Sequence, residues 1–205
     1  ALDFMWQRAW DGVWMLNAAY TWSHSWGNNE GYVRSDNGQD DAGLTTLFDQ
    51  PGLLDGAYGD LPNDRRHQVK LYGAYAVTDD LTLGANFQFW TGRPINAFGY
   101  HPTDIFAQDY DSESFYAGGE LAPRGSRGRT SSYYSVDLSA SYNIDIGEDQ
   151  TLVVRADIFN VLNNDRVTEV NEIYDDESSA DPTNPEVNPN YGLPTAWQTP
   201  RYVRF

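Results

Sequence analysis

Apolar and polar side chains alternate along much of this chain with a period of two. In residues 13–26 the even positions are mainly apolar or aromatic, and the odd positions are mainly small or polar. The same alternation recurs in residues 69–77, 81–89, 134–144 and 152–158 and, over shorter stretches, in residues 2–7 and 202–205. Because a β-strand places successive side chains on opposite faces, the pattern predicts seven strands, each with one apolar face.

Two kinds of connection join the predicted strands. Residues 10–12, 78–80 and 147–150 are short and carry Asp or Gly, which predicts tight turns. Residues 27–65, 96–132 and 164–199 hold most of the Pro, Gly and acidic residues and predict long loops without regular structure. Connections of this length are uncommon inside a compact domain, whereas outer-membrane β-barrels combine short turns on one side with long loops on the other.

The sequence therefore predicts an all-β fold, in which an antiparallel meander of about seven strands forms part of a transmembrane β-barrel. Long loops lie on one side of this sheet and tight turns on the other. A soluble β-sandwich is the alternative, but it would cover its apolar face with a second sheet and would have shorter loops. Because single-chain bacterial barrels have even numbers of strands, from about eight upward, we expect further strands of the barrel outside residues 1–205.

Composition narrows the classes of function. The 205 residues carry 30 acidic and 13 basic side chains, for a formal net charge of −17. Such a chain repels nucleic-acid phosphates, so we expect no nucleic-acid partner. Aromatic residues make up 15% of the chain, which suits the aromatic girdles of an outer-membrane barrel. The sequence has no cysteine, which excludes a thiolate metal site.

Several segments resemble the C-terminal part of TonB-dependent outer-membrane receptors, in particular the Oar-like group. They are the hairpin of Ser131–Ile146 and Thr151–Asn163, with Asn-Val-Leu-Asn at Asn160–Asn163, together with Arg66–Val77, Leu81–Asn96 with Thr-Gly-Arg-Pro at Thr91–Pro94, and Gln198–Phe205. The resemblance implies a bacterial outer-membrane location, a barrel of about 22 strands and an N-terminal plug. It also implies that residues 1–205 are the C-terminal part of one barrel domain, and that the short last strand continues beyond Phe205.

The function implied by this resemblance is TonB-dependent import of a ligand that the sequence does not identify. The implied partners are outer-membrane lipid and lipopolysaccharide, the protein's own plug and the TonB complex. An outer-membrane adhesion or scaffold protein with acidic loops is the alternative. The sequence contains no Gly-x-Ser-x-Gly elbow and no other catalytic constellation, so we expect neither enzyme activity nor a cofactor.

The polar positions of the predicted strands are the first candidate site. In a receptor barrel, polar side chains face the lumen, where they contact water, the plug or the ligand, and apolar side chains of opposite parity face lipid. The predicted lumen-facing residues are Asn17, Thr21, Lys70, Asn86, Gln88, Asp137, Ser139, Arg155 and Asp157.

The long connections hold further candidates. Arg124, Arg127 and Arg129 form a basic cluster, which is expected either to be solvated or to contact lipopolysaccharide phosphates, an acidic ligand or the plug. Asp109, Asp111, Glu113 and Glu120 match the spacing of acidic ligands in a calcium-binding loop, although Ser114 stands where that motif requires glycine. Asp175–Glu177 form a second acidic cluster. The histidines, His24, His67 and His101, are too scattered to predict a zinc site.

Overall fold

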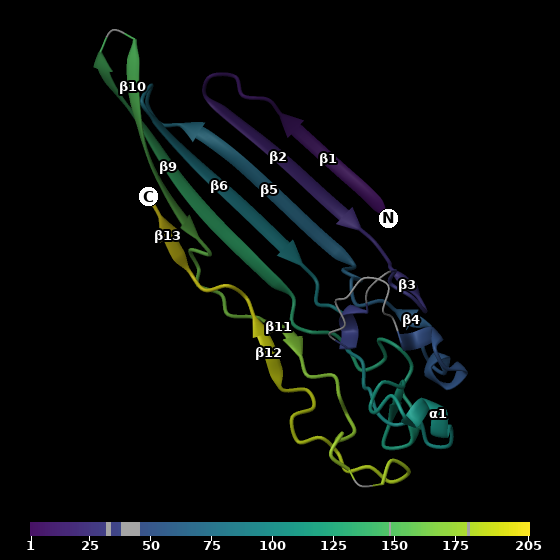
Figure 1. The fold of residues 1–205 in the computed structure, drawn as a ribbon. Coiled ribbons are helices and arrows are strands. Elements are labelled where there is room, and N and C mark those ends of the chain that lie inside the picture. The colour runs from purple at the N-terminus through teal and green to yellow at the C-terminus, as the bar shows by residue number, and fades with distance from the viewer. Residues whose placement is uncertain (32–33, 38–45, 148, 180) are drawn as a thin grey trace.

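The computed structural model describes residues 1–31, 34–37, 46–147, 149–179 and 181–205. It contains one antiparallel sheet of seven strands in the order β1-β2-β5-β6-β9-β10-β13, so each strand pairs with the sheet strand that precedes it in the chain (Figure 1). The strands are β1 (Leu2–Arg8), β2 (Trp14–Trp22), β5 (His67–Ala76), β6 (Leu81–Trp90), β9 (Tyr133–Gly147), β10 (Gln150–Phe159) and β13 (Tyr202–Arg204). The predicted meander of seven strands is confirmed.

The register places the predicted apolar residues on a common face, called the outer face below. Leu138 lies opposite Ala85 on β6 and Ile158 on β10, and the same row continues through Gly73 to Leu16. Many large apolar side chains of this face, including Leu71, Leu83 and Val154, are exposed. Outer-face residues of the sheet include Trp14, Leu16, Tyr20, Leu71, Tyr75, Leu83, Phe87, Val136, Leu138, Val154 and Ile158.

Strand β2 ends earlier than its sequence pattern predicts. The alternation continues to Trp26, but regular pairing with β5 stops at Trp22. Beyond it, the Ser25 amide donates to the Asp64 carboxylate at 2.7 Å, and Trp26 pairs with Asp60 in a separate two-stranded ladder. The chain therefore leaves the sheet because side chains of the following loop provide alternative hydrogen-bond partners.

Short turns and long connections lie at opposite ends of the sheet (Figure 1). The first turn shows why its sequence bends the chain. Asp11 accepts hydrogen bonds from the amides of Val13 and Trp14 at 2.9 and 3.0 Å, and Gly12 adopts a positive φ of 96°. These contacts hold the pKa of Asp11 at about 2. The Asp-Gly hairpin signal is confirmed.

The expectation that the long connections lack regular structure is wrong. They form three two-stranded ladders and several short helices, and among the described residues no helix is long and apolar enough to cross a membrane. These elements are β3 (Trp26–Gly27), β4 (Gly59–Asp60), β7 (Tyr116–Ala117), β8 (Glu120–Leu121), β11 (Val167–Val170), β12 (Pro194–Trp197), the 3₁₀-helices Ser35–Asn37, Thr46–Phe48 and Pro51–Leu54, and α1 (Ile105–Gln108).

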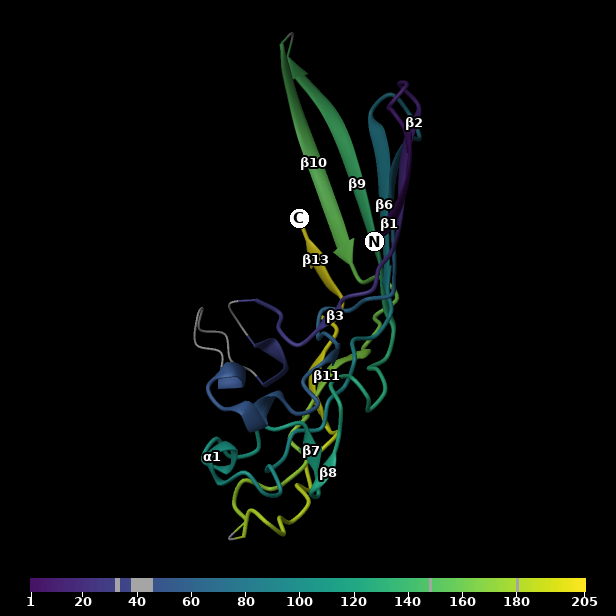
Figure 2. The ribbon, with the colours of Figure 1, turned by 90° about the vertical axis from the view of Figure 1, so that its right-hand side faces the viewer.

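The connections pack together into one body, called the loop assembly below, and they contain the buried core of the chain. Leu47 and Leu53 from the first connection pack with Phe98, Ala107 and Phe115 from the second. A smaller cluster joins the second connection to Tyr174 and Tyr191 of the third. Figure 2 shows that part of the loop assembly leans to the side toward which β9 and β10 bend. The buried hydrophobic core of the described chain therefore lies in the loop assembly and not in the sheet.

Candidate functional site

The polar face of the sheet, called the inner face below, carries the predicted lumen-facing residues. Asn86 of β6 and Asp137 of β9 are cross-strand partners, and the Asn86 amide donates to the Asp137 carboxylate at 3.0 Å. On β10, the Arg155 guanidinium donates to Asp157 at 2.9 Å. Asp157 lies opposite Ser139. Five of the predicted residues therefore form one polar patch across three strands.

This patch lines a depression of about 410 Å³ on the inner face. Asn86, Asp137, Ser139, Arg155 and Asp157 all border it, together with apolar side chains such as Met15 and Phe159. The remaining predicted residues, Asn17, Thr21, Lys70 and Gln88, have the same strand parity but do not border this depression. The inner face therefore presents hydrogen-bond donors, acceptors and charges of both signs to whatever occupies the space beside it.

The Asn-Val-Leu-Asn motif connects β10 to the last strand of the sheet. Asn160 and Asn163 adopt positive φ angles of 48° and 53°, which asparagine tolerates better than most residues. The buried Asn160 side chain donates to the carbonyls of Asn164 and Thr199 at 2.8 and 2.9 Å and accepts from the Asn164 amide at 3.0 Å. Its own amide donates to Asp137 at 2.8 Å. One residue thus joins the end of β10, the approach to β13 and the inner-face patch.

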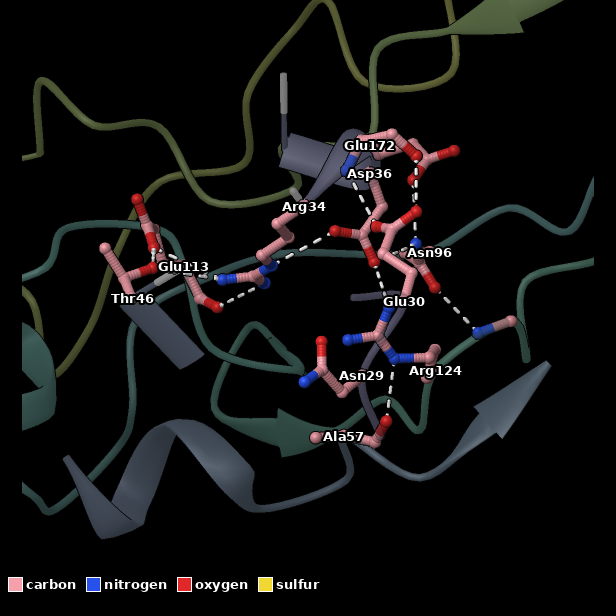
Figure 3. A network of polar contacts seen from close by, with 12 residues as sticks. Asn29, Glu30, Arg34, Asp36, Thr46, Ala57, Asn96, Glu113, Arg124 and Glu172 are labelled. Carbon is pink, nitrogen blue, oxygen red and sulfur yellow. Dashed lines mark hydrogen bonds and ion pairs between the residues drawn. The ribbon is translucent and has the colours of Figure 1, made fainter. Parts of the chain in front are cut away.

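Two buried arginines hold the first and second connections together (Figure 3). Arg34 donates to Asp36 at 3.0 Å and to the Glu113 carboxylate at 3.2 Å, and its guanidinium lies over the ring of Phe98. Arg124 pairs with the other oxygen of Asp36 and donates to the Ala57 carbonyl at 2.7 Å. Burial lowers the pKa of Arg124, against the stabilising charge of Asp36. Each charge has a buried partner, as buried ions require.

The third connection joins this network through Glu172. Its carboxylate accepts from Arg93 at 2.7 Å and from the Asn96 amide at 2.9 Å. The side-chain oxygen of Asn96 in turn accepts from the backbone amide of Gly125, the residue after Arg124. Burial raises the pKa of Glu172, although Arg93 and Asn96 both act to lower it. All three long connections are therefore linked through buried polar groups.

A second ion cluster lies where the strands meet the loop assembly. Asp64 is fully buried and accepts from Arg66 at 2.6 Å and also from Arg129. Asp60 accepts from Arg129 at 2.9 Å, from Arg66 at 2.8 Å and from His24 at 2.8 Å. Burial acts to raise the pKa of both carboxyls, but these donors hold each pKa below its usual value.

The basic cluster predicted from sequence is not a shared basic surface. Arg124 is 3% exposed and paired with Asp36, and Arg129 is half-buried against Asp60 and Asp64, whereas Arg127 is exposed. The expectation of solvated arginines is therefore wrong for Arg124 and Arg129. Their charges are neutralised inside the protein by partners distant in sequence.

Asp109, Asp111, Glu113 and Glu120, which match the calcium-loop spacing in sequence, are not found among the candidate metal ligands that the described structure brings together. Among the described residues, the group of three or more candidate ligands with atoms within 4.8 Å of one another is His24, Asp60 and Asp64, not the four predicted acids. Within the predicted set, Glu113 is engaged by Arg34 and Thr46. The carboxylates that do converge are already paired with two arginines.

The second acidic cluster divides between two environments. Asp175 is fully buried and accepts from the amides of Tyr100 and Gly118, both at 2.9 Å, while burial raises its pKa. Asp176 instead caps a turn by accepting from the Ser178 amide at 2.9 Å. Asp175 therefore joins the third connection to the second, whereas Asp176 stabilises its own turn.

Sequence reasoning missed the residues that organise the loop assembly, especially Arg34, Asp36 and Glu172. Their segments have no periodicity that would indicate burial. The Thr-Gly-Arg-Pro motif at Thr91–Pro94 could have pointed to the structural role of Arg93. At Gly92 a side chain would collide with the Thr130 carbonyl, and Arg93 itself reaches Glu172.

The comparisons with known proteins agree with this architecture. No family model matches the chain. The chain is 30% identical, over 225 aligned residues, to the TonB-dependent transporter Oar of Myxococcus xanthus. The match covers 94% of this chain but 20% of the relative, so the chain spans about a fifth of the length of that curated protein. The chain is therefore similar over nearly its whole length to part of a TonB-dependent transporter, and its open seven-stranded meander is that of part of a β-barrel.

Proposed function

We propose that the intact protein imports a ligand across the bacterial outer membrane with energy supplied through TonB, and that residues 1–205 form the C-terminal part of its barrel. The similarity to Oar along nearly the whole chain carries this proposal. The sheet supports it, because an apolar outer face suits lipid and a polar inner face suits a lumen. In this arrangement the outer face contacts lipid and lipopolysaccharide, and the inner face contacts the plug or the ligand.

The inner-face patch is the part of this chain best suited to those contacts. Asp157 and Arg155 offer a paired carboxylate and guanidinium, and the Arg155 side chain remains 63% exposed despite that pair. Asp137 and Asn86 provide an adjacent acceptor and donor. Such a surface recognises polar partners through hydrogen bonds and charge, and it would hold water when no partner is present.

The loop assembly suits the entrance of the transporter. Its buried ion network links all three long connections, so a ligand would meet a preformed surface. Because part of the assembly leans to the side toward which the sheet bends, we propose that it narrows the path to the inner face (Figure 2).

The test compares solute uptake in three strains of the native host: the parent, a strain lacking this gene, and a strain lacking TonB function. Spent medium is analysed for compounds that the parent depletes. The proposal predicts at least one compound that the parent removes and that both deletion strains leave in the medium. If depletion is the same in all three strains and the gene deletion instead weakens cell adhesion, the adhesion alternative replaces import.

A further inference from the structure

The hairpin of β9 and β10 extends past its neighbours at the short-turn end of the sheet (Figures 1 and 2). Strand β9 runs to Gly147, but its pairing with β6 ends where Tyr142 meets Leu81. One further contact, from the Asn143 amide to the Asp80 carbonyl at 3.0 Å, closes this side. At about 3.4 Å per residue, the extension over residues 143–147 is roughly 17 Å long.

The outer face of this extension is apolar beyond the level of the aromatic side chains. Tyr142 and Tyr75 belong to the turn-end aromatic residues of the outer face, a position where barrels meet the membrane surface. Ile144, Ile146 and Leu152 lie past Tyr142 toward the tip, and all three are at least 38% exposed. Apolar side chains that leave the membrane and stay uncovered indicate an interaction surface.

One edge of the extension also has free backbone groups. In an antiparallel strand, alternate residues direct their amide and carbonyl groups to the same side. Since Asn143 bonds toward β6, Asp145 points its groups the same way, whereas a register shift opposite Gln150 and Thr151 interrupts the alternation before Gly147. Among the described residues, no strand pairs with that side of β9 beyond Asn143. The edge can accept an added strand.

The charge around this edge selects the chemistry of that strand. Asp79, Asp80, Asp145 and Asp149 are all exposed near the turns. In the described part of this half of the sheet, the bases are Arg8 and Arg155, and each is paired with an aspartate of its own segment. The edge is therefore acidic and has no free positive charge to balance it.

We propose that the projecting hairpin is a docking site for an extended segment of a partner protein in which basic and apolar residues alternate. The segment adds as a strand beside Asp145. Its basic side chains face the carboxylates on the inner side, and its apolar side chains pack beside Ile144 and Ile146. Because short turns of outer-membrane barrels are periplasmic, the partner is a periplasmic one. This inference rests on the barrel assignment but not on transport.

The test measures binding of a labelled peptide, with Lys and Val alternating over about eight residues, to the intact protein in lipid nanodiscs. The peptide should bind, and Asp145→Lys should weaken binding about fivefold because one attractive contact becomes repulsive. The matched control is Asp181→Lys, an exposed acid of the long connections, which should change binding less than about twofold.

Two further peptides separate strand pairing from simple charge attraction. A peptide with Glu in place of Lys should not bind, and a Lys–Val peptide N-methylated at alternate residues should lose binding because it cannot donate to the edge. The proposal is overturned if the unmodified peptide fails to bind, if Asp145→Lys binds it as tightly as the parent, or if N-methylation has no effect. Uptake is not measured in this experiment, so its failure would leave the proposed import unaffected.

Discussion

Exchanging two adjacent residues of β9 for arginine gives the sharpest test of the two faces. Leu138 lies on the outer face between Ala85 and Ile158, whereas Ser139 lies on the inner face between Gly84 and Asp157. Leu138 is also midway between the outer-face tyrosines Tyr134 and Tyr142 of the same strand, about 13 Å from each along the strand. Leu138→Arg therefore places a charge near the middle of the lipid-facing band.

The expected difference follows from these positions. An arginine near the bilayer midplane on the lipid face of a barrel costs about 2–4 kcal/mol. With about 1.4 kcal/mol for each factor of ten, Leu138→Arg should lower the folding equilibrium constant roughly 30-fold to 1,000-fold. Ser139→Arg faces the Asp157 carboxylate and the open space left by Gly84, so its effect should stay within about 1 kcal/mol.

The assay is refolding of the intact protein into lipid vesicles across a urea series. The folded fraction is read from the heat-dependent shift of barrel proteins on gels, with Leu138→Ala as a control for simple loss of packing. A similar loss of folded protein for Leu138→Arg and Ser139→Arg would refute the assignment of outer and inner faces. A larger loss for Ser139→Arg would mean that the faces are reversed.

Three further predictions concern the loop assembly and the Asn160 motif. Arg124→Met removes one of the two buried arginines that pair with Asp36 and should destabilise the loop assembly by about 3 kcal/mol. The loops should then be cleaved faster by protease on intact cells, whereas Arg127→Met, at an exposed position, should not change the rate of cleavage. Asn160→Ala removes side-chain bonds at a positive φ and should lower the urea midpoint of the refolded barrel. Because burial raises the pKa of Glu172, the folded loops bind the Glu172 proton more tightly than the unfolded loops do. The contribution of Glu172 to the stability of the loops therefore falls as pH rises from about 4.3, the ordinary pKa of glutamate, through the raised pKa. Protease resistance should therefore fall less between pH 5 and pH 8 in Glu172→Gln than in the parent.

The strands were predictable from sequence because their pattern is local. The alternation from Tyr134 to Ile144 predicts which side chains of β9 share a face, and the register with β6 agrees with that prediction. Even here the alternation fails as a guide at the end of β2, where Ser25 takes a partner from the next loop. Strand faces follow from neighbours in sequence, whereas strand ends depend on contacts made elsewhere.

The loop assembly could not be predicted in the same way. Arg34 and Glu113 are 79 positions apart, and Arg124 and Asp36 are 88 positions apart. Arginine is usually exposed, so the sequence favoured solvated side chains for the basic cluster. The burial of Arg124 and Arg129 depends on acidic partners in the first connection, and no short sequence motif reveals these partners. The inner-face patch was predictable in composition, but its gathering around one depression depended on the strand register.

The shared charges of the loop assembly also limit how a variant of this barrel could be built. Transplanting the first connection alone into another barrel would carry Arg34 and Asp36 into surroundings without Glu113 or Arg124. Arg34 and Asp36 would still pair with each other, but each would lose a further charged partner in a water-poor interior, which is destabilising. Recombination should therefore succeed only when all three connections move together, which makes the loop assembly, rather than the single loop, the unit that can be exchanged between relatives.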